Sequence, residues 1–113
     1  MRFRPLLFAL ALAAALPAVA QTETPPAEFV RRDKGHCMAC HQVPDGAGPA
    51  TRADLGPKLS GERMRALGRA RLREIIEDPT RANPDTVMPP FGRHRILDTG
   101  EITRIVEYLH ALP

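Results

Sequence analysis

The clearest pattern of apolar and polar positions lies near the C-terminal end of the chain. Apolar side chains recur there at spacings of i, i+3, i+4 and i+7, at Ile102, Ile105, Val106 and Leu109. This spacing places the apolar side chains on one face of an α-helix. Asp98, with Glu101 three residues later, has the capping-box arrangement that satisfies free backbone N–H groups where a helix starts. The pattern therefore predicts an amphipathic helix that begins after Asp98 and runs toward the end of the chain.

A shorter pattern of the same kind precedes this helix. Apolar side chains lie at spacings of i, i+3 and i+4, at Leu72, Ile75 and Ile76. They predict a helix over residues 71–77, which Pro79 ends, and Gly68 weakens any extension toward the N-terminus. A further helix is predicted over residues 28–34, where apolar side chains occupy one side.

Two long segments without periodicity separate these helices. Residues 42–61 are rich in proline, glycine and other turn formers, and residues 78–97 include several prolines, which exclude helix and strand interiors. Loops of this length are uncommon in a compact domain unless they pack on something. No segment alternates apolar and polar positions as a half-buried strand does. The predicted fold class is therefore all-α, a small helical domain with long loops.

The first residues have a different character. Residues 1–4 are short and positive, residues 6–16 are continuously apolar, and residues 18–20 are small. This order is that of a secretory signal peptide, so residues 1–20 are interpreted as one, with cleavage before Gln21 and export to the periplasm. The apolar run is shorter than the roughly 20 residues that a membrane-spanning helix needs, so no membrane span is expected after cleavage.

Cleavage would leave a flexible leader at residues 21–27 and a single domain at residues 28–113. The whole chain has 16 basic and 13 acidic residues, but two of the basic residues, Arg2 and Arg4, belong to the signal peptide. The exported protein is therefore close to neutral. No basic tract is interleaved with aromatic residues, so no nucleic-acid partner is expected.

Candidate chemistry is concentrated in the segment Cys37-Met38-Ala39-Cys40-His41. Two cysteines three positions apart, followed at once by a histidine, have the spacing that attaches a c-type haem. Positions i and i+3 share a face of a short helix, so Cys37 and Cys40 can reach the two vinyl groups of one porphyrin. His41 is then placed to give a ring nitrogen to the iron. The expected cofactor is one covalently bound haem c.

Other uses of the two cysteines fit the sequence less well. They could form a disulfide in an oxidising compartment. A redox-active dithiol pair sits at the end of a strand, and no strand pattern precedes Cys37. Zinc would need two further ligands in regular spacing, and none is evident. Outside the signal peptide the aromatic residues are Phe29, Phe91 and Tyr108, so a haem would supply a large flat group that the core lacks.

The second axial ligand of the iron is expected from the proline-rich loop. Thioether sulfur favours ferrous iron, and a His/Met ligand pair raises the reduction potential. Met88 lies on this stiff loop, far enough beyond His41 for the chain to reach the opposite face of the haem. Met64 is interpreted as core filler. His94 follows Met88 closely enough to replace it and stays an alternative ligand.

Two interpretations of Pro57 remain open. Its carbonyl could accept a hydrogen bond from the far ring nitrogen of His41, which fixes the tautomer of a metal-bound histidine, while its ring lies against the porphyrin. Alternatively, Gly56 and Pro57 form an ordinary turn. Phe91 is also expected to pack on the haem.

With these residues the sequence resembles the class I cytochromes c, and more narrowly the SoxX family of monohaem cytochromes. The resemblance covers residues 29–112 and rests on the motifs at residues 34–41, 55–57, 72–78, 83–92 and 94–97. The cysteine motif alone identifies only a c-type haem, whereas the Met-Pro-Pro-Phe-Gly segment that contains Met88 is much more specific. The resemblance implies a helical domain wrapped around one haem, attached through Cys37 and Cys40, with His41 and Met88 as axial iron ligands.

The resemblance also implies partners and a reaction. Members of the SoxX family form a heterodimer with a SoxA subunit, and the complex joins thiosulfate oxidatively to a cysteine of the carrier protein SoxYZ. We therefore expect a SoxA-like partner, a SoxYZ-like carrier protein and a small acceptor cytochrome. The chain would be the electron-transfer subunit of an L-cysteine S-thiosulfotransferase-type complex, with no catalytic residue of its own. The alternative is a stand-alone periplasmic electron carrier.

Overall fold

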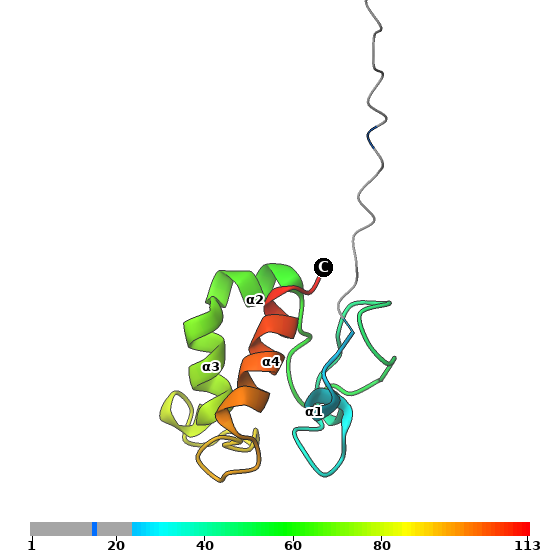
Figure 1. Ribbon diagram of the computed structural model, residues 1–113. Helices are drawn as coiled ribbons and strands as arrows, with labels where there is room; N and C mark the ends of the chain where they lie inside the picture. The colour runs from blue at the N-terminus through cyan, green and yellow to red at the C-terminus, as the bar shows by residue number, and fades with distance from the viewer. Residues whose placement is uncertain (1–14, 16–23) are drawn as a thin grey trace, which may run out of the picture.

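The computed structural model describes Ala15 and residues 24–113 (Figure 1). Apart from Ala15, the predicted signal peptide lies outside the described residues, as do residues 21–23 of the predicted leader, whereas residues 24–27 are described and Ala27 begins α1. The helical elements, in chain order, are α1 (Ala27–Val30), η1 (Cys37–Ala39), α2 (Gly61–Leu67), α3 (Arg69–Glu77), η2 (Pro79–Arg81) and α4 (Thr99–His110). The described residues contain no strand, which confirms the predicted all-α fold. None of their helices is long and apolar enough to cross a bilayer.

α4 begins where the capping box predicts. The Asp98 carboxylate accepts a hydrogen bond from the Glu101 N–H at 2.8 Å, and the Glu101 carboxylate accepts one from the Asp98 N–H at 2.9 Å. The inner face of the helix is buried, through Ile102, Ile105, Val106, Tyr108 and Leu109. Burying one large apolar side chain contributes about 1.5–3 kcal/mol. α4 is therefore the central element of the fold, with α1, α2 and α3 all packed against it (Figure 1).

α3 is slightly longer than the sequence predicts, and α2 is not predicted by it. The expected helix over residues 71–77 begins at Arg69. Gly68 separates it from α2 with a φ of 81°, in the left-handed region that glycine adopts without steric cost. α2 begins after Ser60, whose hydroxyl accepts a hydrogen bond from an N–H of the first turn at 3.3 Å. Met64 is 2 % exposed, which confirms its interpretation as core filler.

α1 is shorter than the helix predicted over residues 28–34. It ends because Arg31 adopts an extended backbone. The chain then turns back, and the Glu28 carbonyl accepts hydrogen bonds from the N–H groups of Gly35 at 3.0 Å and His36 at 3.2 Å. Contact between these residues and α1 replaces the last turns of the predicted helix, and it fixes the start of the cysteine segment against α1.

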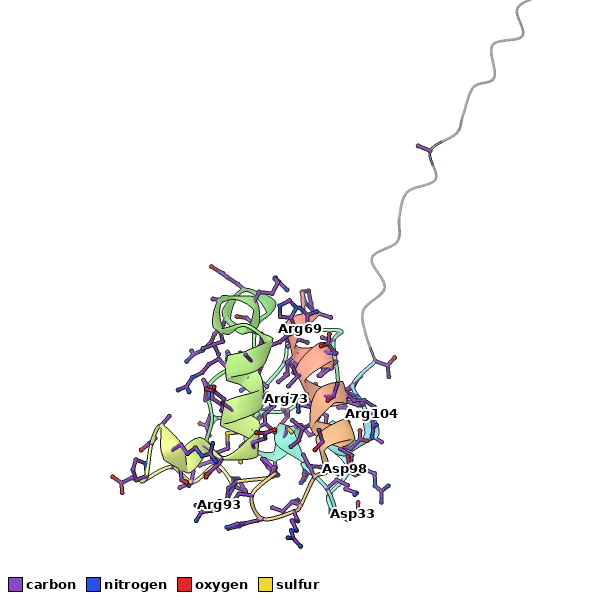
Figure 2. The ribbon with its side chains drawn as sticks, turned by 60° about the vertical axis from the view of Figure 1, so that its left-hand side comes forward. Asp33, Arg69, Arg73, Arg93, Asp98 and Arg104 are labelled. Atoms are coloured by element: carbon purple, nitrogen blue, oxygen red, sulfur yellow. The ribbon has the colours of Figure 1, made fainter. Side chains whose placement is uncertain are left out.

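Contacts between the first and last helices close the domain. The rings of Phe29 and Tyr108 pack edge to face, with centroids 5.0 Å apart and an angle of 67° between their planes. The Tyr108 hydroxyl donates a hydrogen bond to the Ala47 carbonyl at 2.7 Å, which holds the long loop on α4. Arg104, on the side of α4 that faces the N-terminal segment, forms an ion pair with Glu28 (Figure 2). The pairing lowers the pKa of Glu28, so its carboxylate stays ionised.

Candidate haem site

The segment Cys37–His41 forms a single tight turn. The Cys37 carbonyl accepts hydrogen bonds from the N–H groups of Cys40 at 3.2 Å and of His41 at 2.9 Å. η1 covers the first three residues of the segment, so the turn is of the 3₁₀ type and narrower than the α-helical turn expected from the sequence. The two cysteines are one helical turn apart, and the histidine follows directly.

The Cys37 thiol lacks the chemistry of a redox-active pair. Cys37 and Cys40 are both free and are not joined by a disulfide. Burial raises the pKa of Cys37 to about 12, whereas redox-active cysteines have a lowered thiol pKa. The thiol therefore stays neutral at physiological pH. Among Ala15 and residues 24–113, no three His, Cys, Asp or Glu side chains come together as a metal site would require.

The His41 ring is held by the carbonyl of Pro57. Nδ1 of His41 and the Pro57 oxygen are 2.7 Å apart, so Nδ1 is the protonated nitrogen that donates this hydrogen bond. Of the two interpretations of Pro57 that the sequence leaves open, the structure contains the contact with His41. The other ring nitrogen, Nε2, then carries the lone pair that can bind a metal ion.

Gly56 makes this position of the ring possible, and the sequence does not reveal its role. A Cβ at position 56 would lie 2.3, 2.6 and 2.8 Å from Cε1, Nδ1 and Nε2 of His41. Carbon atoms do not approach a ring so closely, so any side chain at position 56 would displace the imidazole. The only sequence signal is that Gly56 directly precedes Pro57, which indicates a turn but not a contact with His41.

Met88 lies in the loop between α3 and α4. Its side chain is half-buried and packs against the hydrophobic core, and its N–H donates a hydrogen bond to the Thr86 hydroxyl at 3.1 Å. The Glu77 carbonyl at the end of α3 accepts hydrogen bonds from the N–H groups of Gly92 at 3.1 Å and Arg93 at 3.0 Å. The loop is thus fastened to α3 a few residues after Met88.

Asp78 braces the same loop from the end of α3. Its side chain is only 7 % exposed, and Arg93 and Arg81 lie 3.5 and 3.6 Å from one of its oxygens. The other oxygen accepts hydrogen bonds from the hydroxyl and N–H of Thr80. These bonds, followed by the two guanidinium groups, lower the pKa of Asp78. The only sequence signal for this buried carboxylate is its place before Pro79, typical of a residue that caps a turn.

The two residues that follow Met88 in the predicted site differ in exposure. Phe91 is 7 % exposed and belongs to the core, whereas His94 is exposed and its N–H donates a hydrogen bond to the Pro90 carbonyl at 2.9 Å. Packing of Phe91 and Pro57 on a haem, and ligation of the iron by Met88, stay predictions.

The side chains of the cysteine segment fit a covalently bound haem. Two unbridged thiols one turn apart match two thioether links, and Nε2 of His41 has no hydrogen-bond partner among the described residues. An all-helical domain arranged around such a segment is a c-type cytochrome domain. The family described as cytochrome c oxidase, cbb3-type, subunit III matches residues 20–109, and the chain belongs to this family. The family implies a covalently bound haem c. No curated protein matches the chain.

Proposed function

We propose that this chain is the electron-transfer subunit of a periplasmic thiosulfate-oxidising complex. In this proposal Cys37 and Cys40 would attach the haem, and His41 and Met88 would bind its iron. The observation that carries the electron-transfer role is the hydrogen bond between His41 and the Pro57 carbonyl, because it leaves Nε2 as the ring nitrogen that can bind an iron.

A haem c supplies one iron that gains and loses a single electron. The hydrogen bond from Nδ1 makes the His41 ring a better donor and keeps one tautomer, so the ring does not turn when the charge of the site changes. The thioether of Met88, bound to the iron, would favour the reduced state and raise the potential. Two protein ligands would suit a relay, whereas a sensor needs a vacant or labile position.

The thiosulfate-oxidising role rests on the resemblance of residues 83–97 to the SoxX family and on the use of the cysteines. Joining thiosulfate to a carrier cysteine forms one S–S bond and releases one proton and two electrons. Cys37 and Cys40, the only cysteines of the chain, are both consumed by haem attachment. The bond must therefore form on the SoxA-like partner and the SoxYZ-like carrier protein, while this chain takes the electrons one at a time and passes them to a small cytochrome.

Two exposed apolar side chains support an obligate partner. Leu55 is 73 % exposed beside Gly56, and Val87 is 80 % exposed beside Met88. An obligate subunit exposes apolar side chains next to its redox centre until the partner covers them. A carrier with exchangeable partners has a charged rim there.

The test is co-expression of the chain with a SoxA-like partner in a host that attaches haem c. A heterodimer should elute, and adding thiosulfate with the carrier protein should produce the absorbance of the reduced haem. Val87→Asp should weaken the heterodimer, whereas Leu67→Asp, at a position 39 % exposed on α2, should not. Elution as a monomer under all conditions, without reduction by thiosulfate, would favour the stand-alone carrier.

The description of the matched family supplies a second candidate, delivery of electrons to a terminal oxidase. The match includes the whole cysteine segment and Met88, so it supports electron transfer with either partner. Reduction of the haem by thiosulfate and the carrier protein separates the two candidates, because an oxidase subunit would not respond to them.

A further inference from the structure

A cleft of about 590 Å³ opens between the end of α3, residues 91–97 and the start of α4. Its lining includes three arginines, at Arg81, Arg93 and Arg95. Figure 2 shows Arg93 and Asp98, which both line the cleft, at the end of the molecule opposite α2. The predicted electron-transfer role does not use these arginines.

The guanidinium groups of the cleft have spare hydrogen-bond donors. Those of Arg81 and Arg93 face one oxygen of Asp78 at 3.6 and 3.5 Å, at or beyond the limit of a hydrogen bond. Arg95 forms no ion pair within the described part of the chain. Each guanidinium carries five N–H donors in a planar fork, which matches the oxygens of an anion.

Arginines of α3 outside the cleft are used differently. Arg69 donates to Glu107 at 2.9 Å, and Arg71 donates to Glu74 at 2.9 Å. Acceptors within the domain therefore bind the N–H groups of these two side chains. The arginines of the cleft therefore differ from Arg69 and Arg71 in having donors that no acceptor among the described residues binds.

The acidic groups of the cleft are already engaged. Asp78 accepts hydrogen bonds from Thr80, Asp98 caps α4, and Glu77 lies 3.6 Å from Arg73 in an ion pair. The carboxylates of the lining equal its arginines in number, so an anion would be held there by directed N–H donors and not by an excess of positive charge. The positive end of the α4 dipole, at the start of a 12-residue helix, adds to the attraction for a negative charge.

The backbone conformation of Arg95 also supports a ligand-binding site in this cleft. Its φ of 57° lies in the left-handed region, which is unfavourable for a residue with a side chain. Strained backbone is kept where the surrounding structure imposes it, and such positions cluster at ligand-binding sites. The turn that contains Arg95 is closed by hydrogen bonds from the N–H groups of Ile96 at 2.9 Å and Leu97 at 3.0 Å to the Phe91 carbonyl.

We propose that this cleft binds a small tetrahedral oxyanion, of the sulfate, thiosulfate or phosphate type, between Arg81, Arg93 and Arg95. Such an anion has several acceptor oxygens within a short span and can take donors from more than one guanidinium. The site goes beyond the proposed electron transfer and does not depend on it, because binding is measured on the chain without its partners.

Isothermal titration calorimetry of the haem-loaded protein with sodium sulfate, thiosulfate and phosphate, at constant ionic strength set with sodium chloride, tests the proposal. At least one of these anions should bind saturably with a stoichiometry near one. Arg93→Ala should weaken binding about tenfold, which is about 1.4 kcal/mol.

Arg95→Gly gives a second variant that should not disturb the fold, because glycine adopts a φ of 57° without steric cost. Its unfolding temperature without anion should be equal to or higher than that of the wild type. The anion should bind it about tenfold more weakly and no longer raise that temperature as it does in the wild type.

Arg63→Ala is the matched control. Arg63 is exposed on α2, at the other end of α3 from the cleft, and its replacement removes the same charge (Figure 1). Its anion affinity should equal that of the wild type. Absence of saturable binding, or equal weakening in Arg63→Ala and Arg95→Gly, would overturn the proposal and leave only general electrostatic attraction.

Discussion

Residues 35–59, which carry His41, are held by close backbone packing, whereas residues 78–98, which carry Met88, are held by polar groups at the end of α3. On the first segment a glycine leaves room for the His41 ring, and a carbonyl 2.7 Å from Nδ1 orients it. On the second, the buried Asp78 carboxylate and the Glu77 carbonyl fasten the loop. A position fixed by steric packing tolerates few substitutions. A loop held by an ionised carboxylate should instead lose stability gradually as the pH falls. We therefore expect the His41 side to determine whether a haem is held, and the Met88 side to tune it.

Removing the attachment cysteines is the largest disruption of the first segment. The double variant Cys37→Ala/Cys40→Ala should carry no covalently bound haem, because no other thiol exists in the chain. The measurement is haem staining after denaturing gel electrophoresis. Met88→Ala, on the second segment, should keep its stain, and loss of the stain in Met88→Ala would contradict the difference between the segments.

Gly56→Ala tests the steric packing around His41. The added methyl group would lie 2.3 Å from Cε1 of the ring, so we expect a loss of about 1–3 kcal/mol in the free energy of unfolding and reduced haem loading. Chemical denaturation measures the first and haem absorbance the second. Gly46→Ala is the control, since it has a φ of 81° but nothing within 4 Å of its Cβ. The Gly46→Ala variant should lose about 1 kcal/mol in the free energy of unfolding because of backbone strain. Its haem loading should equal that of the wild type.

Met88→Ala tests the second segment directly. We expect loss of the near-infrared sulfur-to-iron charge-transfer band of the oxidised protein, with a reduction potential lowered by part of the roughly 0.8 V range that axial ligands control. The fold and the attached haem should remain. Met64→Leu, at a buried core position, should keep the band. A band that persists in Met88→Ala would show that another residue is the ligand, and loss of the band in His94→Ala would identify His94.

Asp78→Asn is expected to have the smallest effect and a pH dependence. The pKa of Asp78 is lowered in the folded protein. Its ionised form therefore stabilises the fold above the ordinary aspartate pKa of about 4, and this contribution is lost as the pH falls through the lower folded-state value. The variant should unfold at a lower temperature than the wild type at pH 7, and the difference should narrow below about pH 4. Asp54→Asn, at an exposed position of the other segment, should show no such difference.

Local sequence signals predicted α4 and the cysteine turn. Each signal, the capping box for α4 and the ligand spacing for the turn, is contained within a few consecutive residues. α2 was not predicted because its seven residues carry few apolar positions and directly follow a loop-forming composition. α1 ends early because the Glu28 carbonyl accepts hydrogen bonds from the N–H groups of Gly35 and His36. Helix propensity takes no account of such a contact. The role of Gly56 was not predictable for a similar reason, since its contact with His41 exists only after the intervening loop has folded back.

The pairing of α1 with α4 has a consequence for biogenesis. Phe29 can pack on Tyr108 only after the residues between them have been made, so α1 and α4 cannot pair while that segment is still being synthesised. The cysteine segment lies just after α1 and stays accessible during that time. Delayed pairing of these helices would therefore leave both thiols open to haem attachment before α4 packs against α1.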